Sequence, residues 1–125
     1  MLQALEFLRD HKEIALATCE GNLPKMRIFQ IMKQECNVLY FATSREKAIY
    51  RELVKNPNVE ILAYADNVSV RCSGMVNFVV YFRLPIAEMD YYNLSPTPPV
   101  FKHFDLIAGE IGDGFVGERF KNTKS

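Results

Sequence analysis

Residues 13–32 read EIALATCEGNLPKMRIFQIM, and this stretch decides the fold class. Over 14–19, larger and smaller side chains alternate as they do on the two faces of a β-strand, and Glu20-Gly21-Asn22 then has the composition of a turn. A second strand-like run occupies 25–32. The stretch therefore predicts two antiparallel strands joined by a short turn.

The sequence on either side extends this unit. Apolar residues recur at helical spacing over 1–12, which predicts a short amphipathic helix before the first strand. Residues 33–37 have the composition of a polar turn, and 38–42 predict a third strand. We expect the three strands to form a meander.

A second helix is predicted after the third strand. Thr43-Ser44-Arg45-Glu46 fits a capping box, in which the first and last side chains bond to backbone N–H groups of the first turn. Tyr50, Leu53 and Val54 form an apolar stripe behind it, and Asn56-Pro57-Asn58 ends it.

The second half of the chain returns to strand patterns. Strands are predicted over 59–64 and 68–77, and a further one over 78–92, where Pro85 requires an edge, a bulge or a strand start. The proline-rich stretch 93–100 predicts an extended loop, and the glycine-rich segment after it receives no assignment.

The composition is that of an ordinary globular domain. The chain has 125 residues, of which 49% are hydrophobic and 24% charged, so we expect a single domain over 1–125. Lys+Arg and Asp+Glu are both 15, and this balance argues against a partner recruited by bulk charge, such as duplex nucleic acid or an anionic membrane. The most apolar stretch, 76–82, is too short to span a bilayer, and the start lacks a secretory signal, so a cytoplasmic location is expected.

The cysteines give no indication of a metal site. Cys19, Cys36 and Cys72 are widely spaced without a Cys-x-x-Cys motif, and the chain has only two histidines. We interpret them as reduced thiols that act as small hydrophobic side chains.

Short-range strand pairing with few helices indicates a mainly β protein. Closing or nearly closing the sheet is the usual way to avoid exposed strand edges. We therefore expect a small, Greek-key-like antiparallel barrel, of the split-barrel or the oligonucleotide-binding type. The pattern alone does not distinguish these two.

Arg27 is the first candidate for a binding residue. The alternation places it on one strand face with Phe29 and Ile31, where a guanidinium needs a partner. That partner is either an acidic side chain or a bound anion, unless the guanidinium reaches solvent past Phe29.

The start of the second helix is the next candidate. Helix N-termini carry unpaired N–H groups, so the hydroxyls of Thr43 and Ser44, with Lys47 one turn further, suit a phosphate. Ordinary capping is the alternative. The predicted meander would bring this turn close to Arg27 and so favours an anion site.

Ser69, Arg71 and Ser73 form a third feature, the polar face of the strand predicted over 68–77. Such a face is commonly exposed to solvent or part of a subunit contact.

The order of these segments resembles the pyridoxamine 5'-phosphate oxidase-like, FMN-binding split barrels. The matching segments are clearest over 1–78: Ala15-Leu16-Ala17-Thr18, Pro24-Lys25-Met26-Arg27-Ile28-Phe29, Leu39-Tyr40-Phe41-Ala42-Thr43-Ser44 with Lys47, Leu53-Val54-Lys55-Asn56-Pro57-Asn58-Val59 and Val70-Arg71-Cys72-Ser73-Gly74. The resemblance implies a split barrel that forms a homodimer, with two FMN molecules in clefts at the subunit interface.

The resemblance also implies roles for particular residues. Arg27 and Lys47 would contact the FMN phosphate, with Thr43 and Ser44 close by. Ile28, Phe29 and Gln30 would run along the isoalloxazine, and Ser69 and Arg71 would approach the flavin from the other subunit.

Two departures from the family limit the function that the resemblance implies. Asn77 runs almost directly into 78–84, where many small members have a helix after the strand that ends in Gly74. The chain also lacks the C-terminal Arg-x-His-Asp-Arg segment, so it is not expected to be a true pyridoxamine phosphate oxidase. We expect an FMN-dependent oxidoreductase with a small-molecule substrate and NAD(P)H as a candidate donor. The alternatives are a non-enzymatic flavin- or haem-binding module and an oligonucleotide-binding barrel.

Overall fold

The computed structural model describes residues 1–42, 48–78, 82–107 and 110–112, and two helices and eleven strands lie within them. Their bounds are α1 Leu2–Asp10, β1 Glu13–Glu20, β2 Leu23–Gln30, β3 Lys33–Glu35, β4 Val38–Phe41, α2 Ala48–Lys55, β5 Asn58–Ala65, β6 Val68–Met75, β7 Asn77–Phe78, β8 Phe82–Pro85, β9 Glu88–Asn93, β10 Val100–Asp105 and β11 Glu110–Gly112. None of the helices within these residues is long and apolar enough to cross a membrane.

Seven strands form the larger sheet, in the order β11-β10-β9-β6-β5-β1-β2. Every pairing in it is antiparallel. The hairpin at 13–32 is confirmed, since β1 and β2 pair from Glu13 opposite Gln30 to Glu20 opposite Leu23. Gly21 adopts a φ of 62° in its turn, a left-handed conformation that glycine reaches without a Cβ clash.

The smaller sheet has four strands, in the order β3-β4-β8-β7. It contradicts the predicted meander, because β4 pairs with β3 and β8 and has no ladder with β2. Residues 33–35, expected to be part of a turn, are strand β3, and the turn is confined to Cys36 and Asn37. The physical reason is that a two-residue loop suffices for a hairpin when its first residue takes a positive φ, as Cys36 does at 51°.

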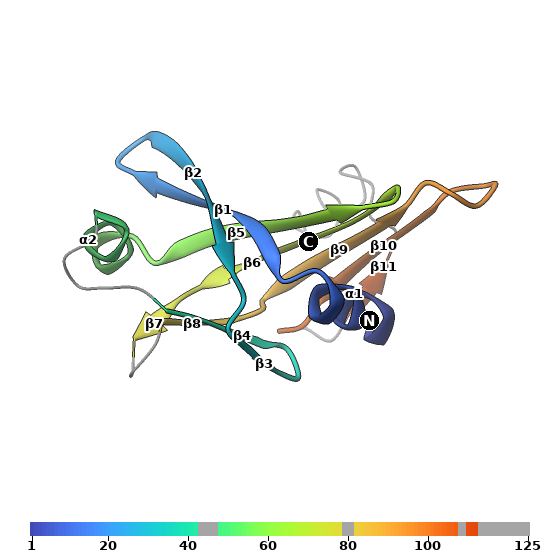
Figure 1. The fold of residues 1–125 in the computed structure, drawn as a ribbon, viewed down its shortest axis with the longest axis horizontal. Coiled ribbons are helices and arrows are strands. Elements are labelled where there is room, and N and C mark those ends of the chain that lie inside the picture. Colours follow the sequence, from blue (N-terminus) through green and yellow to red (C-terminus); the bar gives the residue numbers. More distant parts are fainter. Residues whose placement is uncertain (43–47, 79–81, 108–109, 113–125) are drawn as a thin grey trace.

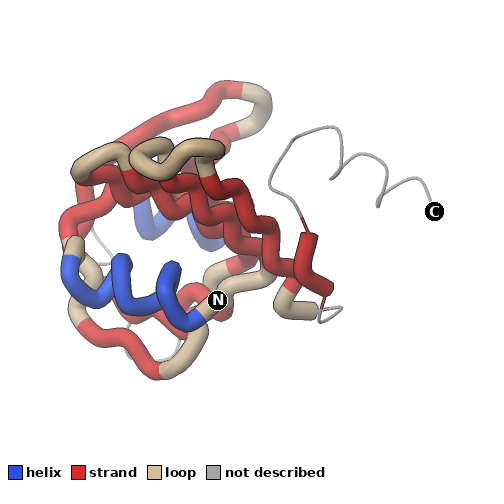
Figure 2. The backbone as a smooth tube through the Cα atoms, turned by 90° about the vertical axis from the view of Figure 1, so that its right-hand side faces the viewer, coloured by secondary structure: helices blue, strands red, loops and turns tan. Residues whose placement is uncertain are grey.

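The two sheets enclose one hydrophobic core. Figure 1 shows α2 at the left end of the molecule and α1 below the large sheet on the right, and Figure 2, along the long axis, shows the strands curving around the space between the helices. The largest fully buried side chains come from both sheets and both helices: Leu8, Ile14, Leu16, Leu39, Phe41, Leu53, Ile61, Phe82, Leu84 and Met89. Because the described strands form two separate sheets and no closed cylinder, the fold is a split barrel.

The second half of the chain follows the predicted order with local changes. Residues 94–99 separate β9 from β10, which confirms the predicted loop. The strand predicted up to residue 77 ends at Met75, and the short strands β7 and β8 follow it. Pro85 is the last residue of β8, opposite Val38, so it is neither at a strand start nor on an edge strand.

The cysteines differ in their surroundings. Cys72 is fully buried in the core, where desolvation raises the pKa of its thiol. Cys36 is exposed in the turn between β3 and β4, so its interpretation as a packed hydrophobic side chain is wrong. Cys19 is half-buried.

Helix α2 packs on the core with part of the predicted stripe: Leu53 is buried, and Tyr50 is half-buried with its ring centroid 4.9 Å from that of Phe78. The buried residues of α2 are Ile49, Glu52 and Leu53, whereas Val54, expected in the apolar stripe, is 58% exposed. Positions i, i+3 and i+4 share one face of a helix, and this face carries a carboxylate into the protein.

Candidate functional site

A cleft of about 460 Å³ lies between strand β2 and the connection from β4 to α2. Its described lining is Arg27, Ile28, Phe29, Gln30, Met32, Ala42, Ala48 and Ile49. The volume falls in the range that small-molecule sites in proteins occupy. Arg27 is the one titratable group among these described lining residues.

Because side chains alternate along β2, the cleft lining contains both core-packed and exposed apolar side chains. Phe29 is half-buried and packs edge-on against Phe41 and Phe82, with ring centroids 6.3 and 5.9 Å away. Ile28 points to the other side of the strand and is 72% exposed. The cleft wall therefore offers apolar surface beside the Arg27 guanidinium.

Arg27 has an acidic partner inside the protein. Its Nη2 donates to Oε2 of Glu52 at 2.6 Å, and its Nη1 donates to Oγ1 of Thr18 at 3.2 Å. The Thr18 hydroxyl in turn donates to Oε1 of Glu52 at 2.9 Å. The partner predicted for Arg27 was either an acidic side chain or a bound anion, and the structure contains the acidic side chain.

This salt bridge leaves much of the guanidinium unused. The group has five N–H donors in total. The two described bonds use two of them, and the Arg27 side chain remains 29% exposed. The three remaining donors can therefore bind an anion in the cleft while the salt bridge persists.

Glu52 is charged at neutral pH in this environment. The hydrogen bond from Arg27 holds the pKa of Glu52 below its ordinary value of 4.5, against the opposing effect of burial. Lys25, with Nζ 3.6 Å from Oε2 of Glu52, acts in the same direction. Lys25 also pairs with the exposed Glu20, with Nζ 3.5 Å from Oε1, so the two cations and two carboxylates of this cluster balance.

The structure brings together only part of the predicted binding set. Arg27, Ile28, Phe29 and Gln30 all line the cleft. Thr43, Ser44 and Lys47 lie outside the described residues, and the residues that flank them, Ala42 and Ala48, line the cleft from the other side.

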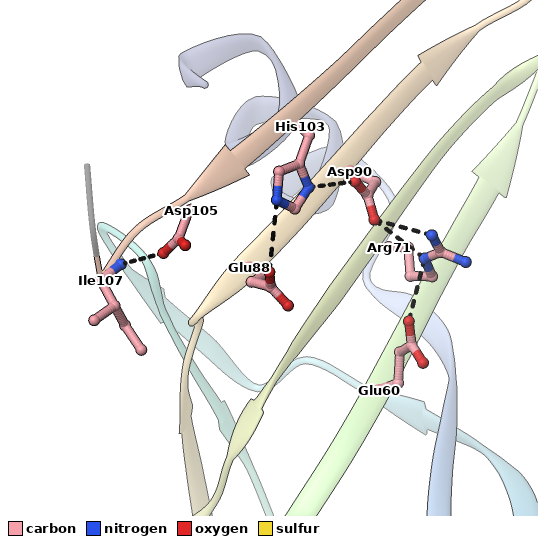
Figure 3. Close-up of polar contacts among 7 residues, drawn as sticks. All are labelled: Glu60, Arg71, Glu88, Asp90, His103, Asp105 and Ile107. Carbon is pink, nitrogen blue, oxygen red and sulfur yellow. Dashed lines mark hydrogen bonds and ion pairs between the residues drawn. The ribbon is translucent and has the colours of Figure 1, made fainter. Parts of the chain in front are cut away.

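Ser69 and Arg71 do not line this cleft; they lie on β6, on the outer face of the seven-stranded sheet. Figure 3 shows Arg71 between Glu60 and Asp90, with His103 on the far side of Asp90. The Arg71 Nη2 donates to Oδ2 of Asp90 at 3.0 Å, and Nδ1 of His103 is 2.6 Å from Oδ1 of the same carboxylate.

The environment of Arg71 stabilises its charge. Burial alone disfavours the charged guanidinium, but the hydrogen bond and the charge of Asp90 outweigh burial and raise the pKa of Arg71. Asp90 and His103 are themselves buried. Carboxylates on the neighbouring strands of the sheet therefore fix the position of the Arg71 side chain.

Sequence reasoning missed Thr18, Lys25 and Glu52. Lys25 could have been found, because it is two residues from Arg27 and so shares its strand face. Glu52 could have been suspected from its spacing to Ile49. Thr18 could also have been suspected, because the β1–β2 register places it opposite Lys25 and diagonal to Arg27 on the same face. That Glu52 meets Arg27 depends on the packing of α2 against β1 and had no signal in the sequence.

A second cavity, of about 500 Å³, lies beside the C-terminal end of β6. Its described lining includes Val59, Gly74, Met75, Ile86 and Ile107 and contains no titratable side chain. It is therefore less suited to an anionic ligand than the cleft at Arg27.

An antiparallel split barrel with a cation-bearing cleft beside β2 defines the class of this protein. Residues 3–112 match the pyridoxamine 5'-phosphate oxidase family. The chain belongs to that family, which confirms the resemblance seen in its sequence and extends it beyond residue 78. A comparison with curated protein sequences finds no match.

Solved structures share the fold at low sequence identity. A pyridoxamine 5'-phosphate oxidase-related, FMN-binding protein from Nostoc punctiforme PCC 73102 superposes with a TM-score of 0.73 at 15% identity, over 89% of this chain and 92% of that one. A NimC/NimA family protein from Clostridium acetobutylicum gives 0.65 at 22% identity, over 85% and 92%. PhzG from Burkholderia lata 383, solved with tetrahydrophenazine-1-carboxylic acid, gives 0.68 at 13% identity, over 89% and 85%.

Proposed function

We propose that the protein is an FMN-binding flavoprotein whose cofactor occupies the cleft at Arg27. One observation carries this proposal: a partly exposed guanidinium with three uncommitted donors stands beside apolar surface in a cleft of ligand size. FMN combines a phosphate with a flat, largely apolar ring system, so it needs both kinds of surface.

The residues present suit the two ends of this cofactor. Arg27 would donate to the phosphate, together with Lys47 and the hydroxyl or backbone groups of Thr43 and Ser44. Ile28, Phe29 and Gln30 would run along the isoalloxazine.

We further propose a homodimer in which Ser69 and Arg71 reach the flavin of the partner subunit. Its support is the outer face of the seven-stranded sheet, where large apolar side chains are 41 to 72% exposed: Met26, Ile28, Leu62 and Tyr64. Apolar groups gathered on one sheet face favour contact with another protein surface. The rigidly held Arg71 stands on this same face.

Bound FMN would supply electron transfer to or from a small molecule, with NAD(P)H as a candidate donor. The chain would bind and orient the cofactor. Because Arg27 is the one titratable group in the described lining, we assign no proton-transfer role to a cleft side chain. Without such a group, the flavin-carrier alternative needs a direct test.

The test compares FMN with riboflavin, which lacks the phosphate. Flavin fluorescence titration of the purified protein should show FMN binding at least tenfold more tightly. Lys47→Met should weaken FMN binding by about tenfold or more and leave riboflavin binding unchanged, because one charge-assisted hydrogen bond contributes about 1.5 to 3 kcal/mol.

Lys55→Met is the matched control, since Lys55 is exposed at the other end of α2. Equal affinity for the two flavins, or equal effects of the two substitutions, would contradict the phosphate assignment. Reduction of the bound flavin by NADH or NADPH, followed as loss of its visible absorbance, separates an oxidoreductase from a carrier.

A further inference from the structure

Glu52 is a buried carboxylate that the proposed cofactor contacts do not use. It is 3% exposed and belongs to the core-facing side of α2. Glutamate is rarely buried to this extent unless it is paired. Its partners are Thr18, Arg27 and Lys25, at 2.9, 2.6 and 3.6 Å.

The contacts form a closed arrangement around Arg27. Thr18 donates to Glu52 and accepts from Arg27, while Arg27 also donates directly to Glu52. Arg27 lines the cleft and Glu52 does not, so the carboxylate lies in the wall beside the guanidinium. An anion that enters the cleft must therefore share Arg27 with a resident carboxylate.

This sharing has an electrostatic consequence. A phosphate bound at Arg27 gains attraction from the guanidinium but is repelled by the Glu52 charge directly behind it. The repulsion acts on the phosphate and not on the uncharged ring system. It therefore reduces the preference of the cleft for a phosphorylated ligand over its unphosphorylated form.

We propose that Glu52 is a specificity-determining residue of the cleft, a built-in counter-ion to Arg27 that weakens phosphate binding. The inference rests on the proposed FMN site. A different role would follow if Glu52 merely positioned Arg27, because its loss would then weaken phosphate binding. The two roles predict opposite changes.

Glu52→Gln separates these roles. Glutamine keeps the shape and can still accept a hydrogen bond from Thr18 or Arg27, but it carries no charge. We expect the dissociation constant for FMN to fall about tenfold at low salt, since a unit negative charge in contact with Arg27 is removed. Riboflavin affinity should stay within about twofold, and the gain for FMN should shrink in 1 M salt, where the screening length is about 3 Å.

Glu35→Gln is the matched control for the change in net charge. Glu35 is exposed on β3, where it pairs with Lys33 and does not line the cleft. This variant should leave the ratio of the riboflavin and FMN dissociation constants unchanged. A gain for FMN in Glu35→Gln equal to that in Glu52→Gln would overturn the local role of Glu52.

The remaining outcomes distinguish this inference from the proposed function. A wild-type protein that binds neither flavin overturns the proposed site. A wild-type protein that binds FMN, with Glu52→Gln binding it equally or more weakly, overturns only the role of Glu52. If Glu52→Gln does not fold, Glu52→Asp is the second test. Its side chain is one methylene shorter, so the charge lies farther from the cleft and the preference for FMN over riboflavin should rise about twofold. No rise would overturn the proposal.

Discussion

Two arginines on strand faces, Arg27 and Arg71, meet buried carboxylates in different electrostatic settings. At the cleft, Lys25 and Arg27 meet Glu52, and Lys25 also pairs with the exposed Glu20, so two positive charges balance two negative charges. On the outer sheet face, Arg71 shares its surroundings with three carboxylates, from Glu60, Asp90 and Glu88, and with His103.

This difference indicates which of the two arginine sites can bind an anion. A strand arginine needs a partner in either setting, but only at the cleft do the charges of the neighbouring side chains balance. The outer cluster has a surplus of negative charge among these side chains, so its carboxylates serve to fix Arg71. The presence of a salt bridge therefore does not exclude a ligand site; the balance of charges around it decides.

The largest expected effect is at the cleft, with Arg27→Met. The substitution leaves the Glu52 carboxylate buried without its main partner, and breaking a buried pair in this way costs about 3 kcal/mol. Urea denaturation measures the free energy of unfolding. The double variant Arg27→Met/Glu52→Leu should recover most of this loss, because no buried charge remains; a single variant that loses less than about 1 kcal/mol would show that Glu52 does not depend on Arg27.

A smaller effect is expected on the outer face, with Asp90→Asn. The amide cannot accept charge-assisted bonds from both Arg71 and His103, so we expect a loss of about 2 kcal/mol in the free energy of unfolding. The control is Lys33→Gln in the exposed Lys33–Glu35 pair, which should change stability by less than about 0.5 kcal/mol. Equal losses in both variants would mean that the outer cluster behaves as an ordinary surface ion pair.

The smallest effect is in the pH dependence of the cleft cluster. Because the pKa of Glu52 is lowered in the folded protein, its charge stabilises the fold fully above its ordinary value of 4.5, and this contribution is lost as the pH falls through the folded-state pKa. Glu52→Gln should therefore be less stable than the wild type by about 1 kcal/mol at pH 7, and the gap should narrow as the pH falls below 4.5 and through the folded-state pKa of Glu52.

Unfolding in urea at pH 7, 5 and 3 measures this gap for the two proteins. A gap that stays constant over this range would mean that the charge of Glu52 does not contribute to stability.

The proximity of Arg27 to the end of the third predicted strand was derived from a strand arrangement that differs from the observed one. The meander was expected to bring Arg27 close to the turn after the third strand, and β4 instead belongs to the other sheet. The two regions still meet, because β2 continues through Ile31 and Met32 into β3, which pairs with β4. The Met32 N–H extends this pairing by donating to the Tyr40 carbonyl at 2.9 Å, and Ala42, which follows β4, lines the cleft.

Local periodicity in the sequence determined most of the strands, the β1–β2 hairpin and the placement of Arg27 and Phe29 on one face, because these depend on neighbours along the chain. Only the tertiary structure decided that β4 joins a second sheet and that α2 turns Glu52 toward Thr18 and Arg27. These choices depend on packing between segments distant in sequence, where the energy of burying a whole helix face outweighs the preference of one carboxylate for water.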